Sequence, residues 1–200
     1  MTFIKTIPEN EAEGPVQELY QQQKGSKDFL PNYARVFCYR PGVMDAWAKL
    51  QKEIRSTMDF RNYELIVLAA AQELNNSYCS LAHGKVLTDN YYTTRQLEDI
   101  VGNRDTNSLS SKEKAMMELA RKVVRNTATI TAEDIEQVRH HGFTEEEIFD
   151  IVTAAAARCF FAKIPDALGV KPDHAYSDFP QSLQNVLVVG REIEGANRAD

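Results

Sequence analysis

The sequence has few of the features that mark several classes of protein. Only three cysteines occur in 200 residues, Cys38, Cys79 and Cys159. Because they are widely spaced and odd in number, a disulfide scaffold is excluded. No run of 18 apolar residues occurs, which argues against a membrane-spanning helix. The longest apolar stretch, residues 151–162, is interrupted by Arg158.

Positive charge is scarce as well. Lys and Arg number 23 against 29 Asp and Glu, which gives a net charge of −6. The chain has no basic patch, so we expect no nucleic-acid partner. The first eight residues contain no apolar run of signal-peptide length. We therefore expect a cytoplasmic protein without a membrane partner, whose thiols stay reduced.

Sustained strand alternation is missing too, and the apolar spacing is that of helices throughout. Hydrophobic residues make up 43% of the chain, enough for the core of one all-α domain spanning residues 1–200. Residues 65–71 are consecutively apolar, which places their helix at the centre of a bundle. The expected early helices are Glu11–Gln23, Leu30–Tyr39, Gly42–Ser56, Tyr63–Leu74 and Tyr78–Asp89.

The later helices are marked by capping boxes, in which a hydroxyl residue precedes an acidic residue by three positions. These pairs are Ser110 with Glu113, Thr131 with Asp134, and Thr144 with Glu147. The last pair opens a long helix, Glu145–Ile164. In helix Gly42–Ser56, an apolar stripe of Val43, Trp47, Leu50 and Ile54 should face the core. We expect residues 1–29 to form an N-terminal helical extension and residues 172–200 to form an irregular tail.

Three residues form the candidate reactive centre. Cys79 and His83 are four positions apart, so they share one face of a helix. Glu64 would lie roughly 22 Å from Cys79 on a single straight helix. A break at residues 75–77 folds the two segments into a hairpin, which allows Glu64 to approach. Cys79 then lies in the first helical turn, where the helix dipole and His83 should make the thiol more acidic than a free one.

Each of these residues also has an ordinary structural explanation. A lone cysteine in an apolar bundle is commonly a buried small hydrophobe. A glutamate near a helix start compensates the helix dipole. Cys79 and His83 could supply half of a zinc site, but no second Cys/His pair completes it, so we expect neither metal nor cofactor. Cys38 and Cys159 are expected in the core, with a distant resolving thiol as the alternative.

The pattern Glu64-x14-Cys79-x3-His83 resembles the motif of the alkylhydroperoxidase D / carboxymuconolactone decarboxylase superfamily. The small residue before the histidine, Ala82, also fits. Segments 35–50, 109–115 and 130–148 resemble neighbouring helices of the peroxidase-related members. The resemblance covers about residues 30–170 and implies an AhpD-like helical bundle that forms homo-oligomers.

The resemblance also implies roles and reveals two departures. Cys79 matches the cysteine that attacks peroxide, His83 the proton-relay histidine and Glu64 the relay carboxylate. Asn76 stands where the family motif has its first, resolving cysteine, and Tyr78 where a histidine is frequent; both are candidate accessory residues. Without the resolving cysteine the usual internal disulfide cannot form, so turnover needs an external thiol or dithiol.

These observations lead to a first functional hypothesis and two alternatives. The first is an antioxidant thiol peroxidase that reduces a hydroperoxide through Cys79, with His83 and Glu64 managing protons. The second is a carboxymuconolactone decarboxylase-like lyase on a small lactone or keto acid, in which His83 is the acid/base and Cys79 is incidental. The third is a non-enzymatic oligomeric redox sensor.

Self-association gives the first testable prediction. One small bundle does not need all the apolar helix faces of this sequence, and the resemblance implies homo-oligomers. We expect a dimer, trimer or hexamer in static light scattering at micromolar concentration. A single species of 22.6 kDa would contradict this expectation.

Overall fold

The computed structural model describes residues 2–102 and 108–196. This part of the chain consists of helices joined by short connections and contains no strand, as the sequence predicted. The α-helices are α1 (Gly14–Lys24), α2 (Asn32–Val36), α3 (Pro41–Ser56), α4 (Phe60–Glu73), α5 (Ser77–Asn90), α6 (Thr94–Val101), α7 (Ser111–Asn126), α8 (Ala132–His140), α9 (Glu145–Ala167) and α10 (Gln181–Leu187). Short 3₁₀ turns occupy Glu9–Glu11, Phe37–Tyr39, Thr127–Thr129 and His174–Asp178.

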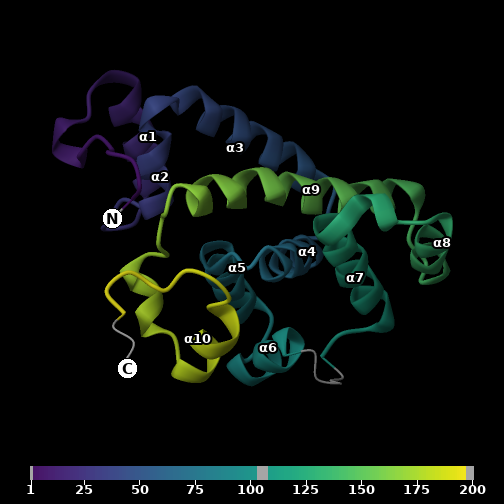
Figure 1. The fold of residues 1–200 in the computed structure, drawn as a ribbon. Coiled ribbons are helices and arrows are strands. Elements are labelled where there is room, and N and C mark those ends of the chain that lie inside the picture. Colours follow the sequence, from purple (N-terminus) through teal and green to yellow (C-terminus); the bar gives the residue numbers. More distant parts are fainter. Residues whose placement is uncertain (1, 103–107, 197–200) are drawn as a thin grey trace.

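Helix α4 is the centre of the bundle. It packs against α5, α7 and α9, and Figure 1 shows it in the middle of the molecule below the long α9. Its residues 65–71 are almost fully buried. The sequence predicted a central helix from this continuous apolar run, and the structure confirms it, because other helices surround α4.

The helix starts follow local capping chemistry. Ser110, Thr131 and Thr144 each form the expected reciprocal capping box, at the starts of α7, α8 and α9. A fourth box, Thr93 with Gln96, opens α6, a helix that the sequence reading did not anticipate. Capping thus fixes several of the boundaries through side chains that lie within one turn.

The apolar side chains form two neighbouring clusters. One surrounds α4, α7 and α9. The other lies among α1, α2, α3, the first turn of α5 and the C-terminal half of α9, and it contains Trp47, Cys79 and Phe161. The N-terminal helices therefore cover the region of Cys79. Leu19 and Tyr20 of α1 are buried, so part of the predicted extension, residues 1–29, belongs to this core.

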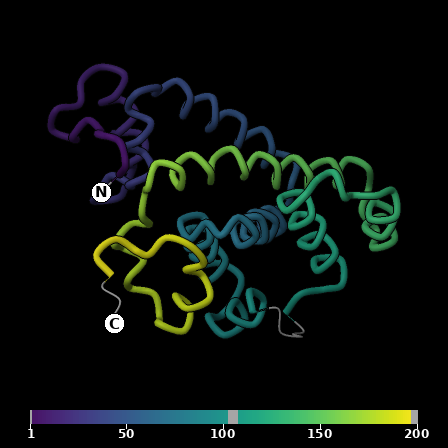
Figure 2. Tube along the Cα trace, viewed as in Figure 1, coloured from purple at the N-terminus to yellow at the C-terminus, as the bar shows by residue number. Residues whose placement is uncertain are grey.

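Two expectations drawn from the sequence, one about the C-terminal segment and one about α3, were wrong. The segment 172–200 was expected to be irregular, yet it contains α10, whose Leu183 and Leu187 are buried against the main cluster. Its described part reaches residue 196, and residues 197–200 lie outside the described chain. The segments leading to both chain ends lie on the same side of the molecule (Figure 2). On α3, Val43 and Leu50 are exposed, so only half of the predicted stripe faces the core.

The burial pattern gives a prediction for stability. Leu65→Ala in α4, at a fully buried position, should lower the free energy of unfolding by about 2–5 kcal/mol because a cavity remains. Lys52→Ala, at an exposed position of α3, is the control and should change it by less than about 0.5 kcal/mol. Urea unfolding measures both, and equal losses would contradict the assigned burial.

Candidate active site

The chain reverses direction between α4 and α5, and this reversal creates the site. Asn75 has a left-handed backbone conformation (φ 53°), which asparagine tolerates better than most residues. The Asn76 side chain then caps α5, because its Oδ1 accepts a hydrogen bond from the Cys79 N–H at 2.7 Å. Cys79 therefore lies in the first turn of α5, where the sequence predicted it.

Asn76 also joins α5 to α9. Its Nδ2 donates to the Ala162 carbonyl at 3.1 Å and to the Asp166 carboxylate at 2.7 Å, and its side chain is almost fully buried. At the position of the family's first cysteine, the chain thus has an amide with three specific partners. The geometry is that of a structural anchor beside the reactive thiol.

Tyr78, the other candidate accessory residue, is engaged elsewhere. Its hydroxyl donates a short hydrogen bond to the carboxylate of Asp173, and it accepts one from the Tyr33 N–H at 3.5 Å. Burial, reinforced by Asp173, raises the pKa of Tyr78. Asp173 belongs to the C-terminal segment, so this bond fastens that segment over the start of α5.

The α4–α5 hairpin brings Glu64 to His83, whereas the sequence led us to expect Glu64 to approach Cys79 as well. The His83 Nδ1 lies 2.6 Å from Oε2 of Glu64, and the Glu64 side chain is buried. Because a carboxylate accepts, Nδ1 carries the proton and Nε2 is left as the basic nitrogen. Burial, together with the nearby Arg158, lowers the pKa of His83 despite the opposing effect of Glu64. At neutral pH His83 is therefore an uncharged base held in one orientation.

Cys79 itself contacts a residue that the sequence reading did not propose for the site. Arg158 of α9 is 2% exposed, and its Nη1 lies 3.8 Å from the Cys79 sulfur. Its Nη2 donates to the Tyr63 hydroxyl at 3.2 Å. The sequence did contain one indication of this role, because Arg158 interrupts an apolar run. A charged side chain is rarely buried at such a position without a function or a partner.

The expected acidity of Cys79 was wrong in direction. Burial raises the pKa of the Cys79 thiol, Arg158 acts against this rise, and Asp166 adds to it. The helix start and the imidazole were expected to prevail, but His83 is uncharged and Cys79 is only 4% exposed. The resting residue is therefore a protonated thiol beside a guanidinium.

The groups of the candidate site thus form two pairs, Glu64 with His83 and Cys79 with Arg158. Among the described residues, no hydrogen bond joins Cys79 to His83 or to Glu64. The pairs lie one helical turn apart on the same face of α5. His83 keeps 13% of its side-chain surface exposed, so protons can exchange with solvent through it.

The other two cysteines lie apart from these pairs. All three thiols are free. Cys38 is buried in the N-terminal cluster, and Cys159 is half-buried with its thiol against the Ala155 carbonyl of its own helix. In the described chain no group of three or more His, Cys, Asp or Glu residues is arranged to hold a metal ion. None of its helices is long and apolar enough to cross a membrane.

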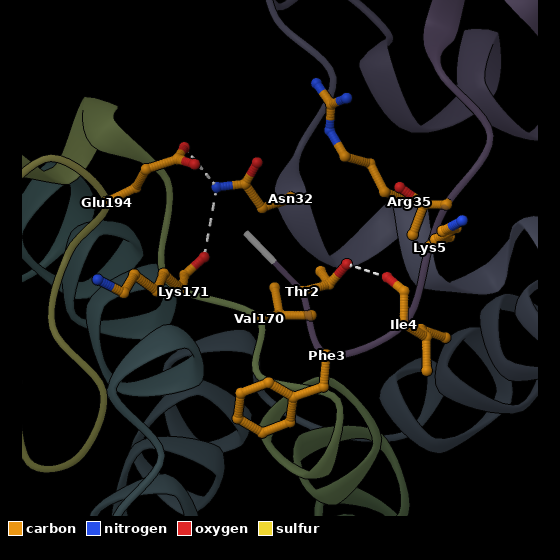
Figure 3. A pocket seen from close by; sticks show the side chains of 10 residues that line it. Thr2, Phe3, Ile4, Lys5, Asn32, Arg35, Val170, Lys171 and Glu194 are labelled. Atoms are coloured by element: carbon orange, nitrogen blue, oxygen red, sulfur yellow. Dashed lines mark hydrogen bonds between the residues drawn. The ribbon is translucent and has the colours of Figure 1, made fainter.

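A surface cavity of the described chain lies away from these groups. A cavity of about 560 Å³ is lined by residues 2–6 together with Asn32, Arg35, residues 170–171 and Glu194. In Figure 3 Asn32 bridges the Lys171 carbonyl and the Glu194 carboxylate. Neither of the two pairs contributes a residue to the lining of this cavity. We therefore assign the cavity no role in the chemistry of Cys79.

Comparisons with known proteins agree with this fold. Residues 41–122 match the carboxymuconolactone decarboxylase family. The chain is similar to a peroxidase-related protein with an alkylhydroperoxidase AhpD core from Ralstonia eutropha JMP134, which is 19% identical with a TM-score of 0.74 over 95% of this chain and 98% of that one. A peroxidase-related protein from Silicibacter sp. TM1040 gives 19% identity and a TM-score of 0.72 over 88% of this chain and 91% of that one.

A third similar structure is the debrominase Bmp8, solved in a cysteine-to-alanine form in complex with 2,3,4-tribromopyrrole. It is 14% identical, with a TM-score of 0.69 over 91% of this chain and 94% of that one. None of the curated proteins matches the sequence. The match over residues 41–122 makes this segment similar to the carboxymuconolactone decarboxylase family, and the solved structures show that the chain has the fold of AhpD-like proteins.

The role of Asn76 gives a prediction. Asn76→Cys introduces the first cysteine of the motif that the sequence resembles, but it removes the cap and both bonds to α9. We expect the free energy of unfolding to fall by about 2 kcal/mol or more, since a lost cap costs about 1 kcal/mol and buried partners are left unpaired. Asn90→Cys, at an exposed position with one bond to its own helix, is the control. Urea unfolding under reducing conditions should separate them; similar losses would show that the Asn76 network contributes little.

Proposed function

We propose that the chain is a thiol-dependent alkylhydroperoxidase with an antioxidant role, in which Cys79 reduces hydroperoxides. The observation that carries the proposal is the pairing of groups around Cys79. A buried thiol in the first turn of α5 lies beside a guanidinium, and an oriented, uncharged histidine follows one helical turn later on the same helix. This arrangement supplies a nucleophile, a charge for its anion and a base.

In the proposed reaction, the Cys79 proton passes to Nε2 of His83, and Glu64 stabilises the imidazolium that forms. The thiolate attacks the outer oxygen of ROOH, the O–O bond breaks, and the alkoxide takes the proton back from His83. The products are ROH and a Cys79 sulfenic acid. Sulfur loses two electrons, and the peroxide gains them.

Asn76 determines how the cycle closes. No thiol stands three residues before Cys79, so an external thiol R′SH condenses with the sulfenic acid to give a mixed disulfide and water. A second R′SH then releases Cys79 as a thiol and R′SSR′. We place this reaction in the cytoplasm, where such reductants are abundant.

A second candidate reaction is reductive debromination, in which Cys79 attacks a carbon–bromine bond in place of a peroxide. The similar debrominase Bmp8, solved with a brominated pyrrole and an altered cysteine, suggests this candidate. The Cys79 thiolate would take the bromine as a sulfenyl bromide, and the ring carbanion would be protonated by His83. Two equivalents of external thiol would then regenerate Cys79 and release bromide.

We also propose self-association through the exposed apolar face of α3 and α9. Val43, Leu50 and Phe160 are each 38–49% exposed, and the Phe160 ring packs on that of Trp47 of α3. A partner covering this face would bury apolar surface close to the helices that hold Cys79 and Arg158.

Peroxide turnover tests the proposal. The wild-type protein should consume cumene hydroperoxide when dithiothreitol is supplied. Cys79→Ser should abolish this activity, and Glu64→Gln should lower it by about 10–100-fold because His83 loses its orienting carboxylate. Cys159→Ser, which changes a thiol outside the site, should leave the activity unchanged.

The alternatives give different results in the same assay. Activity that survives in Cys79→Ser favours a lyase in which His83 is the acid/base. Bromide release from 2,3,4-tribromopyrrole without peroxide turnover favours debromination. A single stoichiometric oxidation of Cys79 that dithiothreitol reverses, without turnover, favours a redox sensor.

A further inference from the structure

Arg158 is a buried cation without an acidic partner. It is 2% exposed, and no carboxylate of the described chain lies within ion-pair distance of it. Its Nε is buried and has no hydrogen-bond partner. Removing a guanidinium from water costs several kcal/mol unless an anion or a full set of acceptors compensates. A purely structural role leaves this cost unexplained.

The partners of Arg158 indicate where the compensating charge arises. Its side chain contacts the Cys79 sulfur and the Tyr63 hydroxyl, and its guanidinium lies 5.7 Å from the Trp47 ring and 5.8 Å from the Phe161 ring. A thiol ionises far more readily than a phenol. Within reach of Arg158, Cys79 is therefore the group on which a negative charge can form.

We propose that Arg158 is a catalytic residue of this centre, whose guanidinium holds the Cys79 sulfur as an anion, first as the attacking thiolate and then as the sulfenate left after oxygen transfer. The second part rests on the proposed peroxidase function; the first part does not. Each proton lost by Cys79 passes to a base, and Arg158 keeps its own protons throughout. The unpartnered Nε and the long Nη1 contact leave donors for the sulfenate oxygen.

The other groups that face Cys79 do not supply this charge. Asp166 of α9 opposes ionisation of the thiol, and the hydroxyls of Tyr33 and Tyr176 face it without positive charge. On α5, the pKa of His83 is lowered by burial and by Arg158, so the imidazole is uncharged at neutral pH. Arg158 is thus the cation that acts on Cys79.

Substitution at position 158 separates a catalytic role from a structural one. Arg158→Met keeps the length and the apolar contacts and removes the charge. The rate of Cys79 alkylation by iodoacetamide, followed on the Cys79 peptide by mass spectrometry, should shift its pH midpoint upward by at least about one unit, equal to tenfold less thiolate at a fixed pH. Arg158→Lys, which keeps a charge, should shift it less. The urea midpoint of Arg158→Met should be no lower than that of wild type.

The matched control is Arg125→Met, which removes an exposed arginine that is ion-paired with Glu73. It should leave the alkylation profile unchanged. An unshifted midpoint in folded Arg158→Met, or equal shifts in both variants, would overturn the inference. If Arg158→Met does not fold, Arg158→Gln, which keeps donors without charge, must show the same upward shift for the inference to stand.

Failure of the inference and failure of the proposed function are distinguishable. If wild-type Cys79 is never oxidised by peroxide but the alkylation midpoint still depends on Arg158, the thiolate pairing is supported and the peroxidase proposal fails. If peroxide oxidises Cys79 but the alkylation midpoint does not depend on Arg158, the peroxidase proposal is supported and the thiolate pairing fails.

Discussion

The hydrogen bonds of Asn76 at the reversal between α4 and α5 fix the start of α5, and with it the place of Cys79 in the candidate site. Its Oδ1 starts α5 at Cys79, and its Nδ2 fixes that start against α9 through Ala162 and Asp166. With α5 fixed in this way, His83 falls opposite Glu64 of α4, and Cys79 falls opposite Arg158 of α9. The same side chain that removes an internal resolving thiol is therefore the one that assembles the site.

The electrostatic balance of the site separates its resting form from its reactive form. Burial keeps Cys79 protonated and His83 uncharged, because each charged form loses water. Arg158 stays charged without a fixed anion. Moving one proton from Cys79 to His83 gives each new charge an opposite partner, the thiolate beside Arg158 and the imidazolium beside Glu64. A thiol protected at rest can thus become nucleophilic when a base and a substrate are both present.

Features decided by neighbouring residues were predictable from the sequence. The capping boxes at Ser110, Thr131 and Thr144 and the helix break after α4 are local, and the structure has them where expected. The break at residues 75–77 predicted the helix hairpin, and the spacing of Cys79 and His83 placed both on one face of α5. The contact of Glu64 with His83 followed from the hairpin.

Features that depend on distant segments were not predictable in this way. The partner of Arg158 is 79 residues away in the chain, so the sequence revealed only an arginine in an apolar run. The acidity of Cys79 was misjudged because the covering helices α1–α3 bury it. Helix α10 was missed since its Leu183 and Leu187 become informative only when packed against the bundle.

The most direct test of the account compares the three cysteines of one protein sample. Wild-type protein is exposed briefly to hydroperoxide in the presence of a sulfenic-acid trap, and each cysteine peptide is quantified by mass spectrometry. The account predicts that buried Cys79 is trapped well before the more exposed Cys159, because reactivity follows the charged partners rather than access. Trapping of Cys159 first, or no trapping of Cys79, would contradict it.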